Sequence, residues 1–259
     1  MNVIDSHVHL YPERDIEKET NVSREPVQDL LYKLSEKIAD KKIDQALIYT
    51  LDKDLYSAEI TDVPDNLILS TTLDINKPYR QALKKAVTKG IKIVKLLPYI
   101  QNIPRSKYPD IVAAAKFAKE NNMVFAICSS YGSKLLYETN GVELAAFVRK
   151  KVDIPIILAH GGAVRVFDAL TMMSEYEDIF IDLSFSLKYW WGSSVIKDYA
   201  FAIKKINSER CFYGSDYPYV GFDESLEYFM RFVNEYNFSD KERDSMLYSN
   251  FGEFKRRYL

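Results

Sequence analysis

Two histidines near the start of the chain have the spacing of a metal-binding pair. The sequence contains three histidines, and two of them, His7 and His9, are separated by a single residue. If this segment is a strand, both side chains lie on the same face, because side chains alternate between the two faces of a strand. Two neutral imidazoles and one carboxylate form a three-ligand site for a divalent transition metal and leave one coordination position open. The same pair can also occur by chance at a solvated strand end, so its surroundings must decide.

Eight short apolar runs, separated by longer amphipathic stretches, predict strands that alternate with helices. The expected strands cover residues 3–9, 43–49, 67–73, 91–97, 123–128, 154–160, 179–184 and 211–216. Apolar residues at three- and four-residue spacing predict helices between them, for example over residues 27–38 and 111–118. Because parallel neighbours need long crossovers, this alternation favours an α/β fold, a single (β/α)8 TIM barrel, over an open doubly wound sheet.

Nothing in the sequence divides the chain into parts. It has no internal repeat, low-complexity segment or linker, so we expect one domain over residues 1–259, a usual length for such a barrel. The apolar fraction of 47% is enough for a large core. We expect a last helix over residues 240–259 to close the bottom of the barrel or to pack on its outer ring.

Composition excludes several classes of function. The formal net charge of -2 and the pI of about 6.0 give no reason to expect a nucleic acid or an anionic membrane as partner. No apolar run has the roughly 18 residues of a membrane span, and residues 2–5 do not follow the pattern of a signal peptide. Cys128 and Cys211 are the only cysteines, which fits a reducing compartment. We therefore expect a soluble cytoplasmic protein.

The chemically useful residues fall at one end of the expected strands. Active sites of (β/α)8 barrels form at the C-terminal ends of the strands. His7 and His9 end the first expected strand, His160 ends the sixth, and Asp216 ends the eighth. The first and eighth strands are neighbours when a barrel closes, so we expect the Asp216 carboxylate beside the first-strand pair. This carboxylate favours the metal-site interpretation of the two histidines.

Five features in this order resemble motifs of the amidohydrolase superfamily. They are Ile4-Asp5-Ser6-His7-Val8-His9, Gly90-Ile91-Lys92-Ile93-Val94-Lys95-Leu96-Leu97-Pro98, Ala159-His160-Gly161-Gly162, Tyr213-Gly214-Ser215-Asp216-Tyr217-Pro218 and the late Asn250. The resemblance runs from residue 3 to about residue 252, nearly the whole chain. It is closest to the branch that contains aminocarboxymuconate-semialdehyde and γ-resorcylate decarboxylases and many uncharacterised hydrolases.

This resemblance implies a role for each matching residue. His7 and His9 match the metal ligands of the family's first strand. Asp216 matches an aspartate that either ligates the metal or orients the attacking water and accepts its proton. His160 matches a histidine that binds a second metal in binuclear members and acts as acid, base or substrate contact in mononuclear ones. We expect one divalent metal ion, zinc, as the cofactor, and the relatives imply a homodimer.

Cys128 departs from the pattern of this branch, whose members usually have a metal-binding histidine at the end of strand five. A thiolate is a good zinc ligand, so Cys128 can take the place of that histidine. It can equally fill the barrel interior as a small apolar residue. Either way, the missing histidine argues against a binuclear site, and Leu97, where relatives often have histidine, points to a reduced site as well.

Several further residues are candidates for binding the substrate. Lys95, on the fourth expected strand, can bind a substrate carboxylate or pair with a nearby acid. Arg165 follows the sixth strand closely enough to reach an anionic group, although it can also be an arginine on a helix surface. Tyr131, Trp190 and Tyr219 follow strands five, seven and eight. Such aromatic residues at the barrel mouth can form a substrate wall or a subunit interface.

These features together predict a metal-dependent hydrolase that cleaves an amide, lactone or ester bond of a small molecule. In this scheme the metal activates water, Asp216 accepts its proton, and His160 polarises the scissile group or protonates the leaving group. One alternative is a metal-dependent non-oxidative decarboxylase, in which His160 or Asp216 delivers a proton to carbon. Another is a non-catalytic binding protein on a decayed scaffold, which Cys128 and Leu97 suggest.

Overall fold

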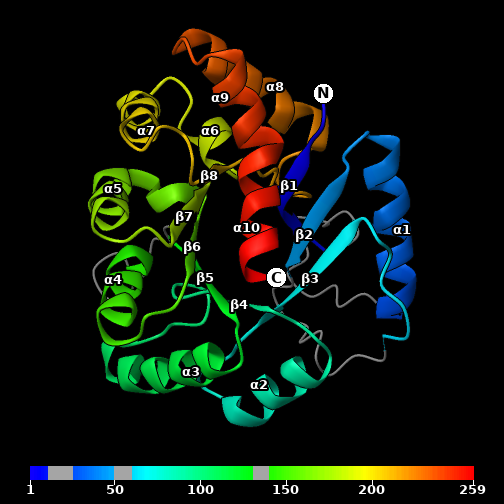
Figure 1. Cartoon of the computed structure of the whole chain (residues 1–259), viewed down its shortest axis with the longest axis vertical. Helices are drawn as coiled ribbons and strands as arrows, with labels where there is room; N and C mark the ends of the chain where they lie inside the picture. The colour runs from blue at the N-terminus through cyan, green and yellow to red at the C-terminus, as the bar shows by residue number, and fades with distance from the viewer. Residues whose placement is uncertain (11–25, 50–59, 131–139) are drawn as a thin grey trace.

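Eight parallel strands form the centre of the molecule (Figure 1). The computed structural model describes residues 1–10, 26–49, 60–130 and 140–259. The strands are β1 (Ile4–His9), β2 (Gln45–Tyr49), β3 (Leu67–Thr72), β4 (Ile93–Leu96), β5 (Val124–Cys128), β6 (Ile156–Ala159), β7 (Ile179–Asp182) and β8 (Cys211–Phe212). Each strand pairs in parallel with the next one along the chain, from β1 to β8.

Hydrogen bonds between β1 and the segment that follows β8 close the sheet into a barrel. The Ser6 amide donates to the Tyr213 carbonyl at 2.9 Å, and the His9 amide donates to the Tyr217 carbonyl at 2.8 Å. The first and eighth strands are therefore neighbours, as expected. The predicted (β/α)8 TIM barrel is confirmed.

Helices surround the strands (Figure 1). They are α1 (Val27–Asp40), α2 (Tyr79–Thr88), α3 (Tyr108–Glu120), α4 (Gly141–Lys151), α5 (Val166–Glu175), α6 (Ser186–Tyr189), α7 (Ser194–Lys205) and α8 (Phe222–Glu235). A 3₁₀ turn covers Arg105–Lys107, and a kinked segment with 3₁₀ hydrogen bonding covers His160–Arg165. Pro26 and Pro78 directly precede α1 and α2, and Pro109 is the second residue of α3. Proline is common at helix starts because its fixed φ angle is already close to the helical value. Within the described ranges, no helix is both long and apolar enough to cross a membrane.

The C-terminal segment closes the bottom of the barrel. It is helical without a break, as α9 (Asp240–Asp244), a π-helical turn (Ser245–Ser249) and α10 (Asn250–Tyr258). Figure 1 shows α10, in red, lying across the strands. Phe251 and Phe254 of α10 pack against Phe180 of β7 and Phe212 of β8 in the barrel interior. Of the two predicted positions for this segment, the barrel bottom is therefore the observed one.

Five strands end earlier than the sequence analysis expects, and in β6 and β8 the difference takes a candidate site residue off the strand. The expected ends were His160 and Asp216, whereas β6 ends at Ala159 and β8 at Phe212. His160 and Asp216 have φ angles of 64° and 66°, in the left-handed region, which interrupts an extended strand. Both residues therefore lie on the loops that follow their strands, still at the C-terminal end of the barrel.

Candidate active site

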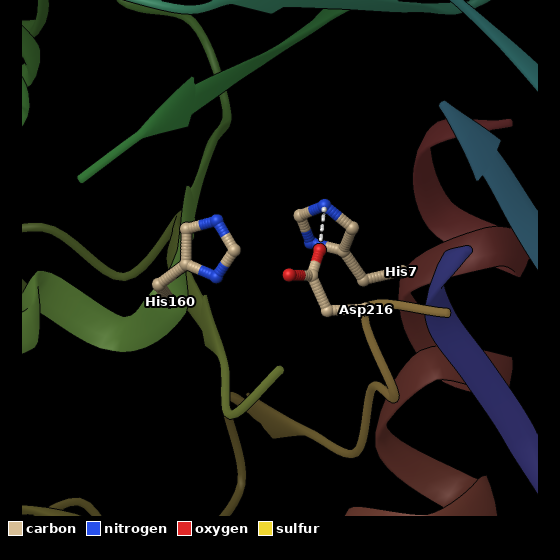
Figure 2. A group of neighbouring side chains, drawn as sticks. All are labelled: His7, His160 and Asp216. Carbon is tan, nitrogen blue, oxygen red and sulfur yellow. Dashed lines mark ion pairs between the residues drawn. The ribbon is translucent and has the colours of Figure 1, made fainter. Parts of the chain in front are cut away.

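Four side chains from three segments converge at the C-terminal end of the barrel. The Asp216 Oδ1 atom lies 3.0 Å from His9 Nε2 and 3.3 Å from His7 Nε2. The His160 ring belongs to the same group, because it offers a ligand atom within 4.8 Å of those of His7 and Asp216. Figure 2 shows the side chains of His7, His160 and Asp216 pointing toward one another. The expected position of Asp216 beside the first-strand pair is confirmed.

The segment after β8 packs closely on β1, and this contact brings Asp216 to the histidines. A Cβ atom on Gly214 would lie 3.0 Å from the His7 Cβ, so a residue without a side chain permits the approach. Asp5 Oδ1 accepts hydrogen bonds from the backbone amides of His7 at 3.0 Å and Ser215 at 2.8 Å. The Asp5 carboxyl group therefore ties the first-strand motif to the segment that carries Asp216.

The His7 ring is held from its Nδ1 side. Asp182 Oδ2 and Ser184 Oγ each lie 3.0 Å from His7 Nδ1. Since a carboxylate accepts hydrogen bonds, this network places the proton on Nδ1 and turns the Nε2 lone pair toward the site. Burial, together with the charge of Lys95, lowers the pKa of His7 to about 3, so the ring is neutral. A neutral imidazole held by a carboxylate on its other nitrogen is the usual form of a histidine metal ligand.

His9 is oriented toward Asp216 by their shared contact. Its Nδ1 atom is buried and has no hydrogen-bond partner among the residues that the structure describes. The Tyr219 ring packs edge-on against the His9 ring, with 5.4 Å between centroids. Burial lowers the pKa of His9, which favours a neutral ring. Nε2 is therefore the His9 atom that faces the cluster.

The distances from Asp216 Oδ1 to the Nε2 atoms of His7 and His9 are close to those between ligands on one metal ion, while the metal-binding group found among the described residues consists of His7, His160 and Asp216. Tetrahedral ligands at roughly 2.0–2.1 Å from zinc lie roughly 3.3 Å from one another. The distances of 3.3 Å and 3.0 Å from Asp216 Oδ1 to the two imidazole nitrogens are close to this value. Burial alone would raise the pKa of Asp216, but the hydrogen bond from His9 and the charge of His160 hold it well below its usual range. Two nitrogen donors and an anionic oxygen therefore fit a divalent metal ion.

His160 is placed by a turn in the left-handed region. A Cβ atom on the next residue, Gly161, would lie 2.7 Å from Tyr199 Cε1, which explains the glycine after the histidine. The His160 amide donates to Asp182 Oδ1 at 3.0 Å, and His160 Nδ1 donates to the Ser184 carbonyl at 3.0 Å. Nδ1 is engaged in this way, and the ring also has a side-chain hydrogen bond with Cys128.

Lys95 brings a positive charge into the same cluster. Its side chain extends from β4, is 1% exposed, and places Nζ 2.7 Å from His7 Nε2. Nζ also lies 4.0 Å from the centroid of the Tyr49 ring. Burial lowers the pKa of Lys95, and the nearby thiol and carboxylates oppose that shift. The observed partner is a histidine, and the predicted role of Lys95 in substrate binding stays a prediction.

The sequence profile of the amidohydrolase family matches residues 4–250, almost the whole barrel. The chain belongs to the amidohydrolase family. The resemblance predicted from the motifs is confirmed, and with it the prediction of an enzyme of this family. A comparison with curated protein sequences gives no match.

Solved structures similar to this amidohydrolase cover nearly all of the chain. A probable 2-pyrone-4,6-dicarboxylic acid hydrolase of Acinetobacter baumannii aligns with a TM-score of 0.70 and 17% identity over 98% of both chains. An uncharacterised TIM-barrel protein of Bordetella bronchiseptica aligns with a TM-score of 0.72 and 14% identity over 100% of this chain and 99% of that chain. A 2,6-dihydroxybenzoate decarboxylase of Rhizobium aligns with a TM-score of 0.61 and 12% identity over 99% of this chain and 98% of that chain. At such low identities the likeness shows the fold.

Cys128 of this amidohydrolase pairs with polar neighbours. Its Sγ atom lies 2.9 Å from Ser130 Oγ. Burial alone would raise the pKa of the Cys128 thiol, but His160 beside it lowers that pKa below its ordinary value. Burial alone would likewise lower the pKa of His160, and Cys128 instead raises it to about 9. Cys128 is not part of the metal-binding group found among the described residues, so its role as a ligand stays a prediction.

A row of aromatic rings reaches from the surface of the amidohydrolase to the cluster. The Trp190 ring contacts that of Tyr189 edge-on at 4.8 Å, and Tyr189 stacks on Phe185 at 5.1 Å. The Phe185 ring lies 6.3 Å from that of His160. Trp190 is therefore connected to the site through two other rings, and its predicted contact with substrate stays a prediction.

The two remaining candidates for substrate binding are Arg165 and Tyr131. The Arg165 side chain is 46% exposed and pairs with Asp168 at 3.1 Å, within the same helical turn. This is the environment of the helix-surface alternative, and a contact between Arg165 and substrate stays a prediction. Tyr131 lies outside the described residues.

Asp182 and Ser184 orient both His7 and His160, and sequence analysis did not single them out. Asp182 is fully buried at the end of β7. Burial alone would raise its pKa, but His7 lowers the pKa of Asp182 to about 2, so the carboxylate is charged. A signal was present, because Asp182 is a charged residue inside an apolar strand, and buried charges are rare unless they are paired.

Proposed function

We propose that this protein is a metal-dependent hydrolase that cleaves an amide, lactone or ester bond of a small molecule. One divalent metal ion would bind to His7, His9 and Asp216. The observation that carries the proposal is the approach of both imidazole Nε2 atoms to one carboxylate oxygen, at 3.3 Å and 3.0 Å. Such a three-ligand set leaves a coordination position for water or substrate.

Zinc is the metal ion that we propose. Imidazole nitrogens suit zinc and other transition metals, whereas magnesium and calcium prefer oxygen donors. Membership of the amidohydrolase family, which typically binds a divalent metal, supports a divalent ion at this site. When bound, such an ion supplies Lewis acidity, which makes water a stronger nucleophile at neutral pH.

Two protein groups would move the protons of the reaction. Both histidine contacts of Asp216 use Oδ1, so we assign the second oxygen, Oδ2, to accept the proton of the attacking water. The His160 ring is held through Nδ1 by the Ser184 carbonyl. We therefore assign His160 Nε2 to polarise the scissile group or to protonate the leaving group. Lys95, Trp190 and Tyr219 remain our candidates for substrate contacts.

The proposal includes a cytoplasmic location and a homodimer. Cys128 and Cys211 are both free and buried, as is usual in a reducing compartment. The homodimer follows from the family resemblance. A small molecule is the expected substrate, because the proposed site lies inside the mouth of a barrel.

A second candidate function is metal-dependent decarboxylation. It is supported by the likeness of the fold to two decarboxylases, the 2,6-dihydroxybenzoate decarboxylase and a 5-carboxyvanillate decarboxylase of Sphingomonas paucimobilis. The second structure aligns with a TM-score of 0.62 and 11% identity over 98% of this chain and 99% of that chain. The same cluster would then hold a substrate carboxylate. His160 or Asp216 would deliver a proton to the carbon atom that loses carbon dioxide.

Metal content and product analysis test these proposals. Protein purified without chelator is expected to contain about one equivalent of zinc by elemental analysis. It is then incubated in ¹⁸O-labelled water with 2-pyrone-4,6-dicarboxylate and with 2,6-dihydroxybenzoate. Label in the product indicates hydrolysis, and release of carbon dioxide indicates decarboxylation. Protein that contains no metal and takes up no added zinc would contradict the proposal.

A further inference from the structure

Lys95 makes a contact that uses the lone pair needed for metal binding. Its Nζ atom lies 2.7 Å from His7 Nε2. The opposite side of the ring is held by Asp182 and Ser184, so the proton is on Nδ1 and Nε2 has a single lone pair. That lone pair either accepts a hydrogen bond from the ammonium group or binds a metal ion. Lys95 and a metal ion therefore compete for one atom.

The surroundings of His7 Nε2 require a hydrogen-bond donor or a cation. His7 Nε2 and Asp216 Oδ1 both present lone pairs and lie 3.3 Å apart. Two acceptors at this distance repel each other in a buried site unless a donor or a cation lies beside them. The Lys95 ammonium supplies this charge, and it is itself stabilised over the Tyr49 ring, 4.0 Å from the centroid.

We propose that Lys95 is an internal cation that holds the metal-binding lone pair of His7 and is displaced when a divalent metal ion binds. This inference rests on the proposed function, because it takes His7 as a metal ligand. The ammonium is tethered at its position by β4. A metal ion must therefore break the hydrogen bond from Lys95 and overcome the repulsion between two positive charges. Lys95 thus sets how tightly the metal binds and holds His7 in the orientation of a ligand.

Removing the ammonium group has the opposite effect to removing a ligand. Lys95→Met keeps a long side chain in the barrel interior but lacks both the charge and the donor. Zinc affinity should rise roughly tenfold to a hundredfold, the size expected for one buried charge-assisted hydrogen bond. Lys95→Gln keeps an N–H donor without the charge and should give a smaller rise. Damage to the fold would weaken binding, so it cannot produce this gain.

Zinc affinity of the purified proteins provides the test. The dissociation constant for Zn²⁺ is measured by competition with a chromophoric chelator for the wild type, Lys95→Met and Lys95→Gln. The matched control is Lys92→Met, which removes a half-buried lysine just before β4 and should leave the affinity unchanged. Circular dichroism checks that each variant folds. If Lys95→Met does not fold, the Lys95→Gln variant decides.

Each outcome bears on the inference in a different way. Tighter zinc binding by the Lys95 variants than by a wild type that binds one equivalent supports it. Equal or weaker binding by the Lys95 variants, while the wild type binds one equivalent, overturns the inference and leaves the proposed metal site intact. Absence of zinc binding from all four proteins overturns both.

Discussion

The two ends of the barrel interior are filled with different kinds of side chain. Buried titratable groups fill the C-terminal end: His7, His9, Lys95, Asp182 and Asp216. Phenylalanine rings fill the opposite end: Phe180, Phe212, Phe251 and Phe254. Buried charges stabilise a fold weakly even when they are paired, whereas burial of apolar surface stabilises it directly. The barrel therefore separates the chemistry at one end from the main source of stability at the other.

Three residues at the C-terminal end of the barrel have left-handed backbone. His160, Phe185 and Asp216, at the C-terminal end, have φ angles of 61–66°. Residues with a side chain rarely adopt this region, and such strain is concentrated at functional sites. The opposite end is covered by the regular helix α10. Left-handed residues also occur just before strands at the opposite end, at Lys42, Asn122 and Ser208, so this backbone conformation does not by itself separate the two ends.

The largest effect should come from removing the first-strand histidines. In the double variant His7→Ala with His9→Ala, metal binding and activity should both be lost, because two of the three proposed ligands are absent. Elemental analysis and turnover are measured on the same preparation. The fold should persist, since the aromatic end is unchanged, and far-ultraviolet circular dichroism checks this. A folded double variant with a full equivalent of metal would refute the ligand assignment.

A large but selective effect is expected at His160. The variant His160→Asn should keep the metal and bind substrate, but turnover should fall about a hundredfold to ten-thousandfold, as is typical when general acid–base help is lost. Metal content and activity are again measured on one sample. If metal content and activity fall together, His160 is a metal ligand. Its position in one group with His7 and Asp216 would then be explained by a shared metal ion. If neither falls, the role of His160 is structural.

The aromatic end should show the reverse behaviour, a loss of stability without a loss of metal binding. Phe254 is 1% exposed and packs on Phe180 and Phe212. Phe254→Ala should lower the free energy of unfolding by about 3–5 kcal/mol. Phe201→Ala, at a ring that is 50% exposed on α7, is the control and should cost less than about 0.5 kcal/mol. Urea denaturation and zinc titration measure the two properties, and weaker zinc binding by folded Phe254→Ala would break the separation.

The sequence was sufficient to predict the parts of this arrangement that depend on local patterns. Apolar runs with period-2 and helical spacing identified the barrel, and a single intervening residue placed His7 and His9 on one face. Asp216 needed one further step, the closure of the barrel, which makes the first and eighth strands neighbours. Each of these steps uses a general rule of chain geometry.

Other contacts could not be predicted because they join distant parts of the chain. Lys95 and His7 are 88 residues apart, and His7 and Asp182 are 175 residues apart. Strand order brings such segments near one another, but it does not determine which side-chain atoms meet. β6 ends where His160 adopts left-handed backbone, a conformation that its residue type does not require, and β8 ends four residues before the left-handed Asp216.

The smallest effect is expected within the titratable end itself, at Cys128. The Cys128 Sγ atom already contacts Ser130 Oγ, so we expect Cys128 to support the cluster rather than to ligate the metal. Cobalt-substituted protein should therefore lack a thiolate-to-cobalt charge-transfer band, and Cys128→Ser should keep its metal affinity, because a hydroxyl group can replace the thiol beside Ser130. Cys211→Ser, at a buried cysteine at the start of β8, is the matched control. A band that Cys128→Ser removes and Cys211→Ser retains would make Cys128 a ligand and extend the metal site to β5.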